Sequence, residues 1–366
     1  MYIHHLKDWV RFTWDTAVLQ PKLAELHRRR GQIMGQMEAL GFTIREHTML
    51  NTLTQDVVKS SEIEGEKLTE DQVRSSIARR LGLEWVGILP ADRHVDGIVD
   101  MMLDATQHYN APLSEKRLFA WHSALFPMGQ SGLYKIRVGN WRNGPMQVVS
   151  GAMGRERVHF EAPGHERISH EMSIFLNWLN TFHQIDPILK AGIAHFWFVT
   201  IHPFDDGNGR ITRALTDMLL ARADQSAQRF YSMSAQILRE RKDYYAQLER
   251  AQRGDRDITA WLKWFIDCLY TSMNETETVL TGVLQRNQFW ERHRETPLNA
   301  RQQDMLAQLL DGFFGKLNTS KWAKMAKCSH DTALRDIQDL IDKGILEKAS
   351  EGGRSTSYVL KREKTA

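Results

Sequence analysis

Apolar side chains recur at intervals of three and four residues along most of the chain, the spacing that places them on one face of an α-helix. The segments that carry this pattern are the predicted helices: 17–39, 44–59, 69–81, 92–109, 114–126, 165–183, 186–201, 210–223, 240–253 and 257–284. Prolines such as Pro90, Pro112 and Pro127 fall in the connections, where a helix has to end. The pattern therefore predicts a mainly α-helical protein.

One stretch, residues 139–163, departs from helical periodicity. It contains valine and phenylalanine and is broken by glycines, among them Gly144 and Gly154. Short β-prone runs on either side of a glycine-containing turn are typical of a hairpin, so we expect Met146–Ser150 to pair with Val158–Phe160. A plain surface loop is the alternative that these residues leave open.

The character of the sequence changes after residue 278. Residues 298–348 are predicted to form three helices: one at the start of this range, one around Ser320–Ala326 and one from His330 to Lys343. Two strands are predicted between Leu346 and Leu360, on either side of the glycine turn 351–353. This order resembles a winged helix. We therefore divide the chain into an N-terminal helical extension (1–110), a core (111–275) and a linker helix with a winged-helix-like domain (276–366).

A winged helix often binds DNA through its third helix, and here the charge on that helix argues against such binding. Its acidic side chains outnumber its basic ones: Asp331, Asp336, Asp339 and Asp342 against Arg335 and Lys343. Because phosphates repel acidic side chains, we favour protein interaction or dimerisation, with DNA contact as the minority interpretation.

Composition narrows the class of protein. The 366 residues suffice for two or three domains, and a net charge of +3 from 48 basic and 45 acidic residues creates no overall attraction to nucleic acid or membrane. The two cysteines, Cys268 and Cys328, are far apart and lack metal-ligand spacing. No apolar run approaches the roughly 18 residues that cross a bilayer, and the first residues lack the apolar stretch of a signal peptide. We expect a soluble, cytoplasmic protein without a membrane partner.

The densest chemistry lies in residues 202–213, which read His-Pro-Phe-Asp-Asp-Gly-Asn-Gly-Arg-Ile-Thr-Arg. Glycines let backbone N–H groups approach an anion closely, and the start of a helix favours negative charge. Arginines pair with phosphate oxygens, a carboxylate can hold Mg²⁺, and a histidine can take a proton from an attacking hydroxyl. A loop that only capped the next helix would need one Asp or Asn, but neither the histidine nor both arginines. The segment therefore indicates a polyphosphate site.

The segment resembles the signature of the Fic family, His-x-Phe-x-Asp/Glu-Gly-Asn-Gly-Arg-x-x-Arg. All specified positions match: His202, Phe204, Asp206, Gly207, Asn208, Gly209, Arg210 and Arg213. The resemblance extends through further motifs from about Leu113 to Leu269, and the N-terminal region looks like the extension of a subset of bacterial members. It implies a Fic-type helical core that transfers AMP from ATP to a Ser, Thr or Tyr hydroxyl of a protein.

The resemblance also assigns roles to residues. His202 would take the hydroxyl proton, and Asp206 would hold Mg²⁺ (or Mn²⁺). The backbone N–H groups of Gly207, Asn208 and Gly209, together with the Asn208 side chain, would stabilise charge on the α-phosphate.

Two arginines complete the phosphate site that the resemblance implies. Arg210 and Arg213 lie three residues apart on one helical face and would hold the β- and γ-phosphates. The catalytic set is thus His202, Asn208 and Arg210. Phe204 is expected to pack against the core.

The adenosine side of the site is expected to come from two other segments. Tyr244, Tyr245 and Gln252 resemble the family's nucleoside-contacting residues, although adjacent helical tyrosines cannot both face one pocket, so one of them belongs to the core. The predicted hairpin corresponds to the family's flap, which clamps the target by main-chain pairing. Its candidate nucleotide contacts are Val148, Val149, Ser150 and Gly151.

Residues 60–65, Ser-Ser-Glu-Ile-Glu-Gly, look like the family's inhibitory motif, Ser/Thr-x-x-x-Glu-Gly/Asn, with Ser60 and Glu64 at its fixed places. The resemblance implies the class whose inhibitory helix is N-terminal in the same chain. A carboxylate that reached Arg213 would neutralise the charge meant for the γ-phosphate. The alternative is an acidic helix end in which Glu62, Glu64 and Glu66 are simply solvated.

Three functional hypotheses remain open. The first is an ATP-dependent protein adenylyltransferase that releases pyrophosphate and is inhibited by Glu64. The second is a transcriptional or interaction protein that acts through its C-terminal domain. The third is a transferase that uses another donor, such as a phosphocholine- or UMP-bearing nucleotide. De-AMPylation, self-modification and a homodimer stay open as well, and the sequence does not identify the target protein.

Overall fold

The computed structural model describes residues 1–38, 42–83, 90–132, 134–151, 157–310, 317–349 and 356–361. It divides the chain into two compact units, Met1–Glu277 and Thr278–Ala366. Within the described residues, no helix is both long enough and apolar enough to cross a membrane.

The first unit is almost entirely helical, so the prediction of a mainly α fold is confirmed. Its helices are η1 (Ile3–His5), α1 (Thr16–Glu38), α2 (Phe42–Ile63), α3 (Glu70–Leu81), α4 (Arg93–Gln107), α5 (Glu115–Leu125), η2 (His165–Arg167), α6 (Ile168–Asn180), α7 (Pro187–Ile201), α8 (Asn208–Asp224), α9 (Met233–Arg239), α10 (Arg241–Gln252) and α11 (Thr259–Arg292), whose last part enters the second unit. The short helix α9 was not predicted, because seven residues are too few to show a helical period.

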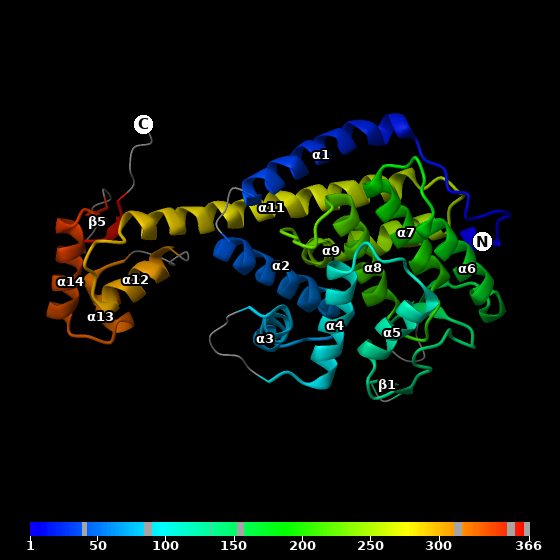
Figure 1. The fold of residues 1–366 in the computed structure, drawn as a ribbon, viewed down its shortest axis with the longest axis horizontal. Helices are drawn as coiled ribbons and strands as arrows, with labels where there is room; N and C mark the ends of the chain where they lie inside the picture. The colour runs from blue at the N-terminus through cyan, green and yellow to red at the C-terminus, as the bar shows by residue number, and fades with distance from the viewer. Residues whose placement is uncertain are drawn as a thin grey trace. The chain divides into compact units, whose positions relative to one another are not determined.

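Helix α7 forms the centre of the first unit and packs along α8 (Figure 1). Its sequence is apolar on all sides, and thirteen of its side chains, from Ile188 to Ile201 except Lys190, are buried. A helix that is apolar all round requires neighbours on every side. Its start is fixed by Asp186, whose carboxylate accepts from the N–H of Ile188, and by Pro187 in the first turn. The packing therefore holds α7 rigidly in the core, and α7 fixes the start of the loop that connects it to α8.

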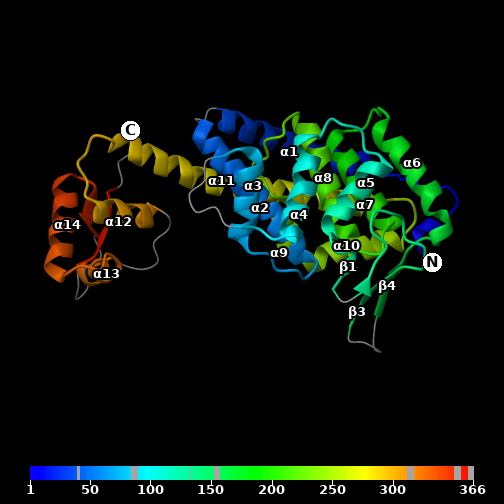
Figure 2. The same cartoon turned by 60° about the horizontal axis from the view of Figure 1, so that its bottom comes forward.

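A β-hairpin projects from the helices of this unit (Figure 2). Strands β3 (Gln147–Ser150) and β4 (Arg157–Glu161) are antiparallel, with Val148 opposite Phe160 and a bulge between Val148 and Val149. The predicted hairpin is confirmed, although Gly154 lies outside the described residues. A second pair, β1 (Gln130–Ser131) and β2 (Tyr134–Lys135), was not predicted, since two residues show no alternation.

The second unit shows the predicted order of elements. They are α12 (Ala300–Leu310), α13 (Thr319–Met325), α14 (His330–Asp342), β5 (Leu346–Lys348) and β6 (Tyr358–Leu360). β5 pairs antiparallel with β6, and a bridge from Leu317 to Tyr358 adds a third extended segment. Trp322, Ile337 and Leu340 are part of its own buried core. The glycine turn 351–353 lies outside the described residues.

The acidic face expected on α14 is smaller than the sequence suggested. Asp336 pairs with Arg301 of α12 at 2.9 Å, and Asp339 accepts from Gln302 of the same helix at 2.7 Å. These two carboxylates therefore bind α14 to α12 within the unit. Helical periodicity alone had not shown which of the four acids face the neighbouring helix.

Candidate active site

The loop 202–207 joins α7 to α8 and is held by buried side chains. The amide of Asn208 spans it, because its Oδ1 accepts from the Phe204 N–H at 2.9 Å and its Nδ2 donates to the Phe204 carbonyl at 2.8 Å. Phe204 is fully buried, as expected, and stacks on His122 with ring centroids 4.2 Å apart. Burial lowers the pKa of His122 to about 4, and this neutral ring lies 3.2 Å from the carbonyl of Asp206.

The side chain of Asn208 contacts the loop itself. Both of its polar atoms bond to the backbone of Phe204, and it is 2% exposed. An amide carries two N–H donors and two acceptor lone pairs, so these two bonds fix its orientation and leave capacity for a ligand. The expected contact between this side chain and the α-phosphate stays a prediction.

His202 caps the end of α7 and presents one ring nitrogen to the loop. Its backbone is left-handed (φ 52°, ψ 60°), and its N–H donates to the Phe198 carbonyl at 3.0 Å. Nδ1 lies 3.0 Å from the Val199 carbonyl, which can only accept, so Nδ1 carries the hydrogen and Nε2 carries the lone pair. Burial lowers the pKa of His202 below its ordinary 6.5. The ring is therefore neutral at pH 7 and is oriented as a base.

Arg142 is a positioning residue that the sequence analysis missed. Its guanidinium is buried and donates to three backbone carbonyls, those of His202 (2.8 Å), Gly144 (2.7 Å) and Pro163 (2.5 Å). It thereby connects the loop of His202 to both ends of the hairpin segment. No motif distinguishes a residue whose partners are all backbone atoms, so the sequence carried no signal for it.

The first turn of α8 forms the anion site. Gly207 has a left-handed backbone (φ 79°), and a Cβ there would lie 2.9 Å from the Phe126 ring, so only glycine fits. The N–H groups that open a helix have no helical partner and attract anions. In this structure the carboxylate of Glu64 covers the turn, because a Cβ on Gly209 would lie 2.0 Å from its Oε1.

Arg213 is bound by the segment predicted to be inhibitory. Its Nε donates to the Ser60 hydroxyl and its Nη2 to the Ser60 carbonyl, both at 2.8 Å, and Nη2 also lies 2.8 Å from the Glu64 carboxylate. The guanidinium is 2% exposed. The contact expected between Glu64 and Arg213 is thus present, and Glu64 is not a merely solvated acid.

Arg210 is held by a different carboxylate. Its Nη1 donates to Glu66 at 2.8 Å, and its guanidinium lies over the Phe126 ring, 5.1 Å from the centroid. Glu66 is in turn hydrogen-bonded to His94 of α4. From the sequence, Glu66 appeared only in the alternative of a solvated helix end, and His94 was not singled out, because a pairing between distant segments leaves no local pattern.

Asp206 has the chemistry expected of a metal ligand. Its Oδ1 accepts from the N–H of Gly207 at 2.6 Å, and its Oδ2 accepts from the Ser131 hydroxyl, so its carboxylate is oriented by two donors. Over the described part of the chain, no group of three or more His, Cys, Asp or Glu side chains could hold a metal by itself. The role of Asp206 as a Mg²⁺ ligand stays a prediction.

The residues expected at the adenosine differ in exposure. Tyr244 is a core residue whose hydroxyl lies 2.9 Å from Nε2 of the buried His195, whereas Tyr245 is 37% exposed. Gln252 is also buried and donates to the Thr200 hydroxyl at 3.3 Å. Tyr245 is thus the more exposed of the two adjacent tyrosines, and Tyr244 and Gln252 contact α7 through His195 and Thr200. Their contacts with adenosine stay predictions.

The flap candidates Val148, Val149 and Ser150 lie on β3, and Gly151 follows this strand directly. The Ser150 hydroxyl lies 2.6 Å from Nε2 of His159, and Nδ1 of His159 lies 3.0 Å from a carboxylate oxygen of Glu249 on α10. Sequence reasoning did not find this link between the two strands and α10. Val149 is 48% exposed, so the flap presents an apolar side chain to solvent.

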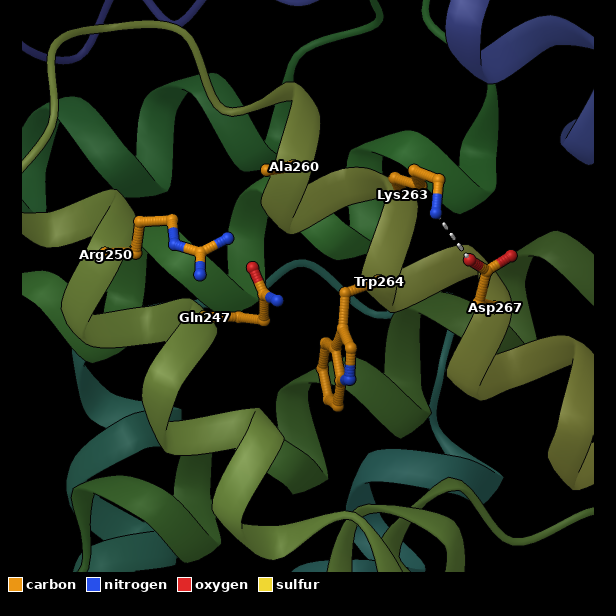
Figure 3. A pocket seen from close by; sticks show the side chains of 6 residues that line it. All are labelled: Gln247, Arg250, Ala260, Lys263, Trp264 and Asp267. Carbon is orange, nitrogen blue, oxygen red and sulfur yellow. Dashed lines mark hydrogen bonds and ion pairs between the residues drawn. The ribbon is translucent and has the colours of Figure 1, made fainter.

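A hollow of about 310 Å³ lies between α10 and α11 (Figure 3). It is lined by Gln247, Arg250, Ala260, Lys263, Trp264 and Asp267, and Lys263 pairs with Asp267 at its edge (Figure 3). None of these residues belongs to the predicted site. The residues of the motif 202–213 lie elsewhere, in the loop before α8 and in its first turns.

Comparison with known proteins supports the family resemblance. Residues 112–220 match the Fic/DOC family, and residues 2–83 match a domain family of unknown function, DUF4172. The protein adenylyltransferase Fic of Drosophila virilis is 31% identical over 219 residues, and that of Aedes aegypti is 30% identical over 223 residues. Each match covers 58% of this chain and 40% of the relative, so the chain matches less than half of their length.

Solved structures agree at the level of the fold. A Fic family protein from Desulfovibrio desulfuricans is similar with a TM-score of 0.54 at 21% identity, over 94% of this chain and 98% of that one. A Fic-1 fragment from C. elegans gives a TM-score of 0.51 at 22% identity, over 73% and 74% of the two chains. The resemblance that residues 202–213 indicated is confirmed.

Proposed function

We propose that this chain, which contains a Fic domain at residues 112–220, transfers AMP from ATP to a hydroxyl side chain of a target protein and releases pyrophosphate. One observation carries the proposal: a neutral His202 with its Nε2 lone pair available adjoins a helix start that bears Arg210 and Arg213. A general base beside an anion site is what nucleotidyl transfer to an alcohol requires. Relatives curated as protein adenylyltransferases support the same activity.

The transfer is a single displacement at the α-phosphorus. The target oxygen bonds to this phosphorus, its proton passes to Nε2 of His202, and the bond to the oxygen that bridges to the β-phosphate breaks. The N–H groups at the start of α8 stabilise the charge that develops on the α-phosphate, and Arg210 and Arg213 hold the leaving pyrophosphate. Mg²⁺, when bound, neutralises phosphate charge, and Asp206 would hold it.

Glu64 regulates this reaction in our proposal. Its carboxylate covers Gly209 and pairs with Arg213, the two places where a polyphosphate would be bound. A carboxylate so placed repels phosphate and neutralises the arginine meant for it. Productive binding of ATP therefore requires Glu64 to move. This arrangement supports autoinhibition rather than a purely structural ion pair.

The partner in our proposal is a protein with an accessible Ser, Thr or Tyr hydroxyl. For the second unit we favour a protein contact over duplex DNA, because α14 carries four aspartates and only two basic residues over 330–343, and phosphates repel acidic side chains. A salt-dependent mobility shift with duplex DNA would support the minority interpretation.

The proposed activity is tested by mass spectrometry of a cell lysate incubated with the Glu64→Gly chain, ATP and Mg²⁺. We expect AMP on hydroxyl side chains of one or a few proteins, this chain included if it modifies itself. Labelling with UMP or phosphocholine from competing nucleotides would favour another donor. Loss of AMP from previously modified proteins would favour the reverse reaction.

A further inference from the structure

The two motif arginines differ in how their charge is balanced. Arg213 faces Glu64 and the polar atoms of Ser60, so a single carboxylate meets a single guanidinium. Arg210 faces Glu66, and Glu66 also faces His94. Arg210 also lies 3.9 Å from Asp206, so the carboxylates and cations around the two arginines differ in number.

His94 is a cation in this arrangement. Its Nδ1 lies 3.1 Å from the Leu125 carbonyl, and its Nε2 contacts the Glu66 carboxylate. Both neighbours are acceptors, so both ring nitrogens must donate, which only the imidazolium can do. The hydrogen bond to Glu66 accordingly raises the pKa of His94 above its ordinary value. Two cations share one carboxylate, and the group of His94, Glu66 and Arg210 keeps a net positive charge.

Arg210 keeps two donors available, whereas Arg213, bound at Nε and Nη2, keeps only Nη1 among the described contacts. Glu66 takes only Nη1, and the face of the guanidinium rests on the Phe126 ring. Nε is buried without a partner among the described residues, and Nη2 is 3.9 Å from the nearest oxygen of Asp206. A buried unpaired donor is costly unless a ligand satisfies it.

We propose that Glu66, fixed by His94, is a positioning residue that holds Arg210 so that its Nε and Nη2 donors stay available for the polyphosphate of ATP. The inference rests on the proposed function of the same site. Glu64 and Glu66 then have opposite effects. Glu64 keeps Arg213 from binding phosphate, whereas Glu66 holds Arg210 in the position that binds it. The Glu66 side chain acts through Arg210 and does not itself touch the substrate.

The test compares variants in the Glu64→Gly background, in which Arg213 is released. We expect Glu66→Gln to weaken binding of ATP–Mg²⁺, measured by calorimetry, by about tenfold, and to raise KM for ATP equally while kcat stays within about twofold. His94→Gln, which keeps a donor but loses the charge, should produce the same loss. Glu62→Gln is the matched control, because Glu62 lies nearby in the last turn of α2 and pairs only with Lys59 at 2.9 Å among the described residues.

A pH series adds a readout that a purely structural role would not change. Glu66 and Arg210 are the charged groups that face His94. Because the pKa of His94 is raised, its charge is present at low pH and is lost as pH rises. ATP affinity should therefore fall with rising pH, and His94→Gln should remove that slope.

The outcomes are distinguishable. Unchanged or tighter ATP binding by Glu66→Gln would overturn the inference, and tighter binding would make Glu66 a second inhibitory acid. Failure of the Glu64→Gly chain itself to bind ATP would overturn the proposed function instead.

Discussion

The carboxylate of Glu64 lies 2.8 Å from Nη2 of Arg213 and fills the space over Gly209 in the first turn of α8. The contact joins the turn after α2 to the helix that begins the phosphate site, across 149 positions of sequence. An anion from the protein thus lies at the place where we propose that the phosphates of ATP bind. The regulation proposed for this chain depends on that overlap.

Replacing Glu64 with glycine removes this competing anion. We expect the Glu64→Gly chain to transfer AMP at least about fivefold faster than the wild type, because the repulsion of phosphate and the neutralisation of Arg213 both disappear. Incorporation of labelled AMP into protein measures the rate. Glu62→Gly removes an acid of the last turn of α2 that pairs with Lys59 rather than Arg213, and it should leave the rate unchanged. Equal rates for the wild type and Glu64→Gly would contradict the inhibitory role.

Replacing His202 with alanine removes the proposed base. We expect AMP transfer by the Glu64→Gly/His202→Ala chain to fall by about 10²–10⁴-fold relative to Glu64→Gly alone, the range typical for loss of a general base. ATP binding should persist, since the phosphate contacts come from α8. His170→Ala, at an exposed position of α6, is the control. A double variant that retained most of its activity would rule out His202 as the base.

The burial of His202 predicts the pH dependence of the reaction. Because burial lowers its pKa below 6.5, the ring stays neutral when pH falls from 8 to 6.5, and protonation inactivates it only at lower pH. We therefore expect kcat of the Glu64→Gly chain to be level across that interval and to decline below it. Rates at saturating ATP test this directly. A decline that began above pH 7 would show that His202 titrates like an exposed histidine.

A buried acidic cluster predicts how stability varies with pH. Asp56 of α2 and Asp217 of α8 are both buried with one guanidinium, that of Arg229, and Asp56 accepts from the Ser232 hydroxyl at 2.5 Å. Burial and the charge of Asp217 raise the pKa of Asp56 to about 8 against the opposing effect of Arg229. The folded chain thus holds a proton that the unfolded chain releases above about pH 4.

It follows that the free energy of unfolding contributed by Asp56 declines as pH rises from about 4 to 8. Asp56→Asn mimics the protonated acid and should become more stable than the wild type as pH rises, by at most about 1.4 kcal/mol per pH unit. Urea unfolding at pH 5 and pH 8 measures the difference. Asp243→Asn, at an exposed acid of α10, should show no such change, and a wild-type slope in Asp56→Asn would refute the linkage.

Parts of the molecule that depend on local pattern were predictable. The helical periodicity predicted α7 and α8, and the stretch broken by glycines predicted β3 and β4. Eight positions of one motif indicated the phosphate site. The Glu64–Arg213 contact was also expected, because both residues lie in motifs that fix their partners.

The remainder depends on contacts between distant segments. Glu66 and His94 meet through the packing of α4 beside the turn after α2, and Arg142 binds only backbone carbonyls. The bonds between the Asn208 amide and the Phe204 backbone could not be read from the sequence either, because the signature does not say which way a side chain points. Tyr244 and Tyr245 were indistinguishable until the helix was placed against His195. Side-chain direction, rather than residue type, was the missing information.

The central claim is that the start of α8 binds ATP so that a hydroxyl deprotonated by His202 can attack its α-phosphorus. The most direct measurement incubates the Glu64→Gly chain and a protein substrate with Mg²⁺ and ATP labelled at either the α- or the γ-phosphate. We predict label on protein from the α-position, none from the γ-position, and none from either when His202 is also alanine. Label transferred from the γ-phosphate, or α-label that persists without His202, would contradict the account.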